Sequence, residues 1–362
     1  MKSGENINFS DKPGHAFRQI LHLWGIHLII MNKFFFLVLI ILSITDCLAQ
    51  KKKEVFVTAP ELKEWITYLA SDEMRGRVNG SPEMKTAAYW IAGKFSENGV
   101  KPVSLDSGLI QNYTFTSRQQ SINERNVIGI IEGTDPSLKD QYIVLSAHFD
   151  HIGIRKGLKS DSICNGADDN AAGTCTLIGI TKTINLSGIK PGRTIVLAAF
   201  SGEEYGMRGS RYFVSRPPVL LKNIYADLNF EMTGHSEYLG KNKYYMTGCQ
   251  YSNLDDLIAE YNRGTGFQLV DTIPIANMLF NASDNIAFSK ISAVEGITLG
   301  IPSGTFATSA TPGYLHNVTD EVELFDFDNM AELISYFSDL VIWLSNNKSD
   351  VVWTDPAFSR IK

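Results

Sequence analysis

Segments with helical spacing and segments with strand-like patterns alternate along the first half of the chain. Apolar side chains recur every three or four residues over 59–70 and 83–98, which predicts two helices. Apolar and polar side chains alternate over 110–116 and 125–132, a pattern typical of strands. The continuous apolar run QYIVLSA at 141–147 predicts a central strand that is buried on both faces.

The same alternation continues through the second half of the chain. It predicts further strands at 194–200, 224–231, 243–247 and 293–299. It predicts helices at 170–186, 206–215, 253–263, 284–290 and 328–345. Strands that alternate with helices indicate an α/β fold, a three-layer α/β/α sandwich around a central mixed, mostly parallel sheet. The pattern shows no repeat and no linker, which favours one domain over 50–362.

The residues before this domain read as an export signal. From Met31, a lysine precedes the apolar run 34–42 and the small-residue stretch CLA at 47–49, the order of a signal peptide over 31–49. The run is shorter than the roughly 20 apolar residues that span a bilayer. We therefore expect an exported protein, periplasmic or secreted, without a stable membrane span after processing. The alternative is a lipoprotein anchored at Cys47, which the preceding Asp46 disfavours.

Composition and charge exclude some classes of partner. The formal net charge is −6 and no basic cluster compensates it, which argues against nucleic-acid binding. Cys164, Cys175 and Cys249 remain after processing; two of them can pair in an exported protein, but the sequence does not determine which, nor any oligomeric state. Residues 1–30 have no structural pattern, and we interpret them as a non-native or untranslated extension before Met31.

Histidines and carboxylates follow the ends of several predicted strands. They are His148, Asp150, His151, Glu203, Glu204 and Glu231, with His316 in a loop after a later strand and Asp168 and Asp169 at the start of the predicted long helix. Singly, each has an ordinary explanation as a hydrogen-bonded histidine, a helix N-cap or a solvated glutamate. Because the carboxyl ends of parallel strands meet at one edge of a sheet, their joint occurrence predicts a metal site there. Nitrogen and carboxylate ligands without thiolates suit zinc. His235, in contrast, is interpreted as an exposed loop residue.

Several runs of sequence resemble the co-catalytic di-zinc exopeptidases related to secreted bacterial leucyl aminopeptidases and glutamate carboxypeptidase. The matching runs, in the order of the family, are AHFDHIG (147–153), NGADDNAAG (165–173), FSGEEYGMRGSRYF (200–213), NFEMTG (229–234), ASDNIAFSKI (282–291) and HNVTDEVE (316–323). The segment 68–95 resembles the family's N-terminal helical region. The resemblance implies an exported metalloaminopeptidase that binds two Zn²⁺ and hydrolyses N-terminal residues from peptides.

The resemblance also implies roles for individual residues. Five would be metal ligands, two on one zinc, two on the other and one bridging both: His148 and Glu231, Glu204 and His316, and Asp168. Glu203 would be the general base that takes a proton from a metal-bridging water. Asp150 would be the carboxylate that orients the imidazole of His148.

Three details of the resemblance concern single positions. The family has a cis peptide bond after its bridging aspartate, which implies a cis bond between Asp168 and Asp169. Glu231 occupies a position where many relatives have aspartate. Relatives often have an assisting tyrosine directly before the last histidine, whereas this chain has Leu315 there and Tyr314 one residue earlier. The sequence leaves open whether Tyr314 reaches the reacting carbonyl.

Other functions on the same fold remain as alternatives. One is a glutaminyl cyclase-like enzyme with a single zinc, which the full set of apparent ligands disfavours. Another is a carboxypeptidase of acidic dipeptides, which needs arginines in its pocket such as Arg155, Arg208 or Arg211. A third is a receptor-like binding module, in which metal ligands are typically lost. The stretch 126–141 is too short to hold a protease-associated insert.

Overall fold

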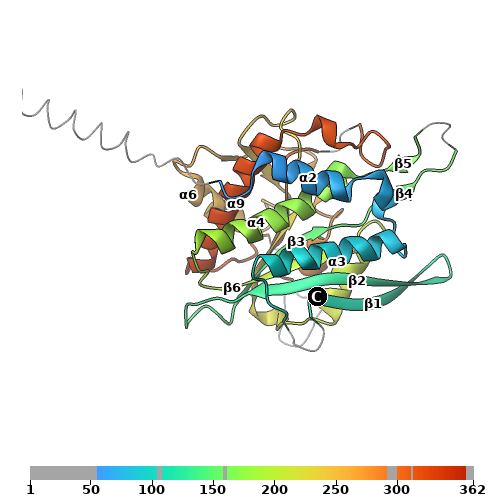
Figure 1. Cartoon of the computed structure of the whole chain (residues 1–362). Helices are drawn as coiled ribbons and strands as arrows, with labels where there is room; N and C mark the ends of the chain where they lie inside the picture. Colours follow the sequence, from blue (N-terminus) through green and yellow to red (C-terminus); the bar gives the residue numbers. More distant parts are fainter. Residues whose placement is uncertain (1–54, 104–107, 158–160, 292–299, 311–312, 356–362) are drawn as a thin grey trace, which may run out of the picture. The chain divides into compact units, whose positions relative to one another are not determined.

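The structure is a computed structural model that describes residues 55–103, 108–157, 161–291, 300–310 and 313–355 (Figure 1). The predicted signal peptide, the segment before it and the predicted strand 293–299 lie outside these residues. Among the described residues, no helix combines the length and the hydropathy needed to cross a lipid bilayer.

A mixed sheet forms the centre of the described fold, with strand order β1-β2-β6-β3-β7-β10-β8-β9. Its strands are β1 (Ile110–Ser117), β2 (Gln120–Ile131), β3 (Tyr142–His148), β6 (Thr194–Phe200), β7 (Ile224–Phe230), β8 (Lys243–Met246), β9 (Gln268–Leu269) and β10 (Ser303–Ala307). The central strands β6, β3, β7 and β10 run parallel, whereas β1, β2 and β8 pair antiparallel with their neighbours β2, β6 and β10. The predicted mixed, mostly parallel sheet is confirmed.

Helices cover both faces of this sheet. The layer seen in front of it in Figure 1 consists of α2 (Ala59–Leu69), α3 (Pro82–Glu97), α4 (Gly173–Ser187) and α9 (Phe327–Asn346). The opposite face packs against α5 (Arg208–Ser215) and α8 (Asn285–Ser289), through Phe213 and Phe288. Each face of the sheet has its own hydrophobic core. Successive residues of β6 point to opposite faces, so Leu197 packs in the core under α2, α3, α4 and α9, and Val196 packs in the core with Phe213 and Phe288. The three-layer prediction is therefore confirmed.

The helix starts follow from local sequence. Ser81 precedes α3, and its hydroxyl accepts a hydrogen bond of 3.1 Å from the backbone N–H of Met84. Pro82 occupies the first turn, where its missing N–H costs nothing. The predicted helix 170–186 begins later than expected, at Gly173, because Asp169 and Asn170 have non-helical backbone angles with φ of −108° and −136°.

The remaining described elements are short. They are β4 (Gly153–Ile154), β5 (Ile163–Cys164), α6 (Leu254–Asn262), α7 (Ala276–Leu279) and the short, partly irregular helical segments Asp72–Arg77, Ala167–Ala172, Leu221–Asn223 and Val322–Leu324. Cys164, Cys175 and Cys249 are all free thiols, so the described residues contain no disulfide.

Candidate metal centre

The ends of the central parallel strands carry the polar residues of the site. His148 ends β3, Glu203 and Glu204 follow β6, and Glu231 follows β7 directly. After β6, Gly202 has a φ of +76°, which glycine adopts without strain and which turns the chain toward the two glutamates. Because these strands run in one direction, the sheet brings the side chains to one edge, as the sequence indicated.

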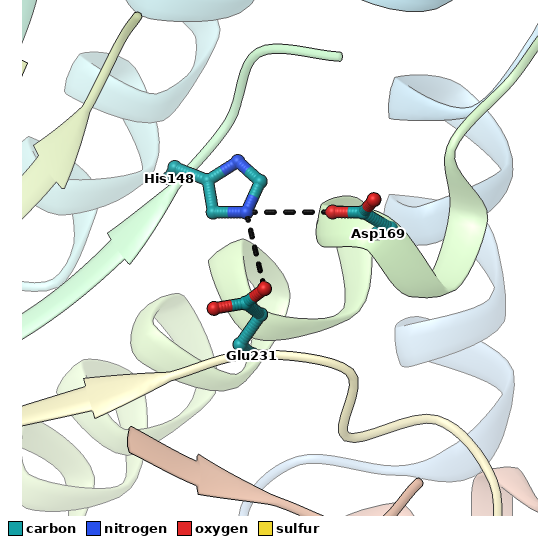
Figure 2. A group of neighbouring side chains, drawn as sticks. All are labelled: His148, Asp169 and Glu231. Atoms are coloured by element: carbon teal, nitrogen blue, oxygen red, sulfur yellow. Dashed lines mark ion pairs between the residues drawn. The ribbon is translucent and has the colours of Figure 1, made fainter. Parts of the chain in front are cut away.

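A first group of metal-donor atoms consists of His148, Asp169 and Glu231 (Figure 2). The Nε2 atom of His148 lies 3.4 Å from Oδ1 of Asp169 and 3.8 Å from Oε1 of Glu231. This nitrogen is buried and has no hydrogen-bond partner. A buried polar atom usually has a partner, so its position between two carboxylates fits a bound cation. The hydroxyl of Ser283 donates a hydrogen bond to the other oxygen of Glu231 and fixes its direction.

A second group of donor atoms lies on the other side of Asp169. Nε2 of His316 is 3.1 Å from Oδ2 of Asp169 and 3.1 Å from Oε1 of Glu204. Nδ1 of His151 is 3.0 Å from the same oxygen of Glu204 and 3.6 Å from the same oxygen of Asp169. The sequence marked His151 as a strand-end residue but assigned it no role.

Asp169, and not Asp168, lies between the two groups, with one carboxylate oxygen toward each. The expected bridging position of Asp168 is therefore wrong by one residue. The carboxylate of Asp168 points away and accepts hydrogen bonds from the Gly234 N–H at 3.0 Å and from the Ser309 hydroxyl at 2.7 Å. The cis peptide bond is displaced in the same way, since it joins Asp169 to Asn170.

The structure answers the open question about Tyr314 and corrects the expectation for His235. The Tyr314 hydroxyl donates to Asp168 at 3.2 Å and the residue does not line the cavity beside the donor groups, whereas Leu315 does. His235 is 1% exposed rather than a surface residue. The centroid of its ring lies 4.7 Å from that of the Tyr314 ring and 4.9 Å from that of the Phe325 ring, so a later segment of the chain covers His235.

Asp150 contacts His148 differently from the expected carboxylate–imidazole pair. Nδ1 of His148 lies 3.2 Å from the backbone carbonyl of Asp150 and 3.7 Å from its carboxylate. The carboxylate instead accepts hydrogen bonds from the backbone N–H groups of Glu203 at 3.1 Å and Glu204 at 3.2 Å, and from the Asn79 amide at 2.7 Å. Asp150 thus holds the backbone of both glutamates, and its carbonyl orients the imidazole.

Replacing Asp150 with asparagine is expected to loosen both glutamates. An amide offers one acceptor oxygen, so a partly buried N–H of Glu203 or Glu204 would lose its partner, at a cost of about 1 kcal/mol or more. We expect a lower melting temperature and a roughly 10–100-fold weaker affinity for zinc, typical of lost support around metal ligands. Calorimetric zinc titration measures this, with Asp135→Asn, which lies outside both donor groups, as control. Unchanged zinc affinity in the Asp150 variant would contradict the role of Asp150 in holding Glu203 and Glu204.

Burial and neighbouring groups shift the pKa values of several side chains in the site. Burial raises the pKa of the Glu203 carboxyl well above its usual range, and His148 only partly offsets this effect. Burial also opposes ionisation of Glu204, but hydrogen bonds from His151 and His316 outweigh it and lower the pKa of Glu204. Hydrogen bonds to Asp169 and Glu204 raise the pKa of His316 to about 10. Glu204 is thus held in the ionised form, in which a carboxylate can bind a metal, whereas the environment of Glu203 favours its protonated form.

Arg77 connects the loops of the site through hydrogen bonds to their backbone carbonyls. No sequence pattern assigned it this role. The side chain is fully buried and donates hydrogen bonds of 2.8 Å to the backbone carbonyls of Phe149, Asn165 and Gly166. These carbonyls belong to the loops that carry His148 and Asp169. A guanidinium with five donors in a rigid plane can connect several carbonyls at once, which fixes the two loops relative to each other.

A cavity of about 370 Å³ adjoins both donor groups. Glu203, Glu204, Glu231, Asp169 and His316 lie at the metal-donor end. The rest of the lining is mainly apolar and consists of Gly206, Met232, Tyr245, Thr247, Leu279, Ala282, Ser283, Thr305, Ala307 and Leu315. No arginine or lysine lines it among the described residues, so Arg155, Arg208 and Arg211 do not contribute the anion clamp considered above.

The chain belongs to peptidase family M28. Residues 126–341, more than half of the chain, match this family. The match begins in β2 and includes every residue of the two donor groups. The predicted resemblance is therefore confirmed at the level of the family.

The relatives of the chain include proteins named as aminopeptidases and proteins named as carboxypeptidases. The chain is 25% identical to leucine aminopeptidase 1 of Trichophyton rubrum over 60% of this chain and 57% of that protein. It is 30% identical to a probable glutamate carboxypeptidase of Arabidopsis thaliana over 37% of this chain and 18% of that protein. The chain thus spans less than two thirds of the length of these relatives.

Solved structures share the fold. A zinc aminopeptidase from Bacillus subtilis superposes with a TM-score of 0.58 at 16% identity, over 82% of this chain and 98% of that chain. Glutaminyl cyclase from Porphyromonas gingivalis gives the same TM-score at 17% identity, over 79% and 98% of the two chains. At these identities the likeness establishes the fold alone.

Proposed function

We propose that the protein is an exported zinc aminopeptidase that binds two Zn²⁺ and hydrolyses N-terminal residues from peptides. The observation that carries the proposal is the position of Asp169, whose two oxygens face two separate groups of histidine and carboxylate donors. The donors suit zinc, because they are imidazole nitrogens and carboxylate oxygens. His148 and Glu231 would complete one site, and Glu204 and His316 the other.

The chain's own residues have distinct tasks in this reaction. Two zinc ions, when bound, polarise the scissile carbonyl and lower the pKa of water. Glu203 lies in the cavity wall outside both donor groups, so its carboxylate is free to take a proton from the attacking water and give it to the leaving amine. Asp150 accepts a hydrogen bond from the backbone N–H of Glu203, which holds the base in the cavity wall beside the donor groups.

The cavity favours an aminopeptidase over a carboxypeptidase of acidic dipeptides. Met232, Leu279 and Leu315 offer apolar contact to a side chain, and the carboxylates beside them can accept hydrogen bonds from a free α-ammonium group. A substrate carboxylate would need an arginine or lysine, which the described lining does not contain. The predicted signal over 31–49 supports export.

A substrate panel tests the proposed activity. We expect aminoacyl anilides with apolar side chains to be cleaved, N-blocked analogues to be inert, and thorough removal of zinc by a chelator to abolish turnover reversibly. Release of the anilide chromophore measures the rate, and zinc added back is the control for protein damage. Equal cleavage of N-blocked substrates would contradict the aminopeptidase assignment, and activity without zinc would contradict the metal chemistry.

A second candidate is a glutaminyl cyclase-like enzyme, because a structure of that name shares the fold. Such an enzyme would use one zinc, whereas the structure has two donor groups. Zinc content after dialysis, together with an assay for cyclisation of an N-terminal glutamine peptide, separates the two candidates. Two bound zinc ions together with hydrolysis would support the aminopeptidase. One bound zinc ion together with cyclisation would support the glutaminyl cyclase-like enzyme in its place.

A further inference from the structure

His151 is the donor in the second group that the expected ligand set does not include. It follows β3 in the run HFDH, three residues after His148, and its side chain is fully buried. Its backbone N–H donates to the carbonyl of Arg77 at 3.2 Å. Its ring lies against Gly166, where an added Cβ would be 2.5 Å from Cγ of the imidazole. Backbone and ring are thus both held in place.

The donor atoms around His151 lie close enough to one another to share one zinc ion. Ligand atoms 2.0–2.2 Å from a zinc ion in a tetrahedron lie about 3.3–3.6 Å from one another. In the second group, Nδ1 of His151 is 3.0 Å from Glu204 and 3.6 Å from Asp169. Nε2 of His316 is 3.1 Å from each of the same two oxygens. One of these four separations falls within that range and three are slightly shorter, so a small outward shift of the donors would admit a zinc ion between them.

The nitrogen that faces the carboxylates is suited to bind a metal. Nε2 of His151 is buried without a hydrogen-bond partner, whereas Nδ1 faces Glu204 and Asp169. A neutral imidazole with its proton on Nε2 presents a lone pair at Nδ1, which is the form that binds zinc. The competing arrangement places the proton on Nδ1, from which His151 would only donate a hydrogen bond to Glu204.

We propose that His151 is a direct ligand of the second zinc, through Nδ1, together with Asp169, Glu204 and His316. This inference rests on the proposed two-zinc site and extends it. The second site then has four protein donors, whereas the first has three from His148, Asp169 and Glu231. The second site should therefore bind zinc more tightly and fill first. The first site, with fewer protein ligands, is the one that keeps an open position.

His151→Asn separates ligation from hydrogen bonding. The asparagine amide nitrogen takes about the place of Nδ1 and can still donate to Glu204, but an amide is a poor zinc ligand. We expect the variant to fold, and to lose more than about 100-fold in affinity at the tighter site, beyond the usual cost of an outer-shell change. Zinc titration of the metal-free protein against a chromophoric chelator measures both affinities. Wild-type affinity in the variant would overturn the proposal.

X-ray absorption gives a readout that a merely structural role would not change. With one equivalent of zinc, we expect the wild type to show two imidazoles per zinc, from His151 and His316, and His151→Asn to show one. A single imidazole in the wild type would overturn the proposal. The control is His235→Asn, which removes another buried histidine that lies outside both donor groups and should leave the spectrum unchanged.

The zinc stoichiometry of the wild type separates the two levels of the argument. If the wild type binds fewer than two zinc ions, the proposed two-zinc function fails. If it binds two and shows one imidazole at one equivalent, the two-zinc function stands and the role of His151 is wrong.

Discussion

Replacing Glu203 with glutamine is expected to leave both zinc ions bound and to reduce kcat by about 10²–10⁴-fold, the usual contribution of a general base. Glutamine has the size of glutamate but cannot take a proton. Metal binding should survive, because the Glu203 side chain lines the cavity but belongs to neither donor group. Turnover of an aminoacyl anilide and zinc content by mass spectrometry check the two halves of the prediction.

The neighbouring Glu204→Gln is the matched control for this experiment. Glu204 faces both His151 and His316 at 3.0–3.1 Å, and its carboxyl is held ionised by them. We expect the amide to weaken zinc binding at the second site, so that this variant loses metal and activity together. If both variants lost zinc to the same extent, the separate roles of the adjacent glutamates would be wrong.

The positions of the strand ends were predictable because strong apolar runs define the strands. QYIVLSA and the strand that precedes Glu203 have continuous apolar residues, and parallel strands that end in polar residues must bring them to one edge. The edge and most of its histidines and carboxylates therefore followed from the pattern alone.

The direction in which a single side chain points was harder to predict from the sequence, as Asp168 and Asp169 show. Adjacent residues point different ways, and which of them faces the site depends on the irregular turn Ala167–Ala172 before α4. No periodicity encodes this turn. The contacts of Asp150 were inaccessible for a similar reason, because its carboxylate accepts hydrogen bonds from N–H groups that lie more than fifty residues later in the chain.

Distant packing explains the other differences. The sequence pattern places His235 in a loop, which predicted exposure, but Phe325 and Tyr314 from a later segment cover its ring. Arg77 belongs to a single turn of helix, and its partners are carbonyls of two other loops. Such contacts depend on which loops the fold brings together, and a single sequence does not contain that information in its local pattern.

The pair Asp169→Asn and Asp168→Asn tests the most consequential of these corrections, the identity of the bridging carboxylate. Asp169 faces both donor groups with one oxygen each, at 3.4 Å from His148 and 3.1 Å from His316. An amide in its place removes a negative charge from both groups and turns a donor NH₂ toward one of them. We expect zinc affinity to fall by more than about 100-fold at both sites, beyond the cost of an outer-shell change, with loss of activity.

Asp168→Asn changes the same chemical group one residue away, and we expect it to keep both zinc ions. The amide oxygen can still accept from the Gly234 N–H, and the hydroxyls of Ser309 and Tyr314 can rotate to accept from the amide NH₂. The variant should therefore lose about 1 kcal/mol of stability or less, within the range of a single rearranged hydrogen bond. Zinc titration and thermal unfolding of the two variants side by side measure the difference. Loss of both metals from Asp168→Asn, with retention in Asp169→Asn, would restore the bridge to Asp168.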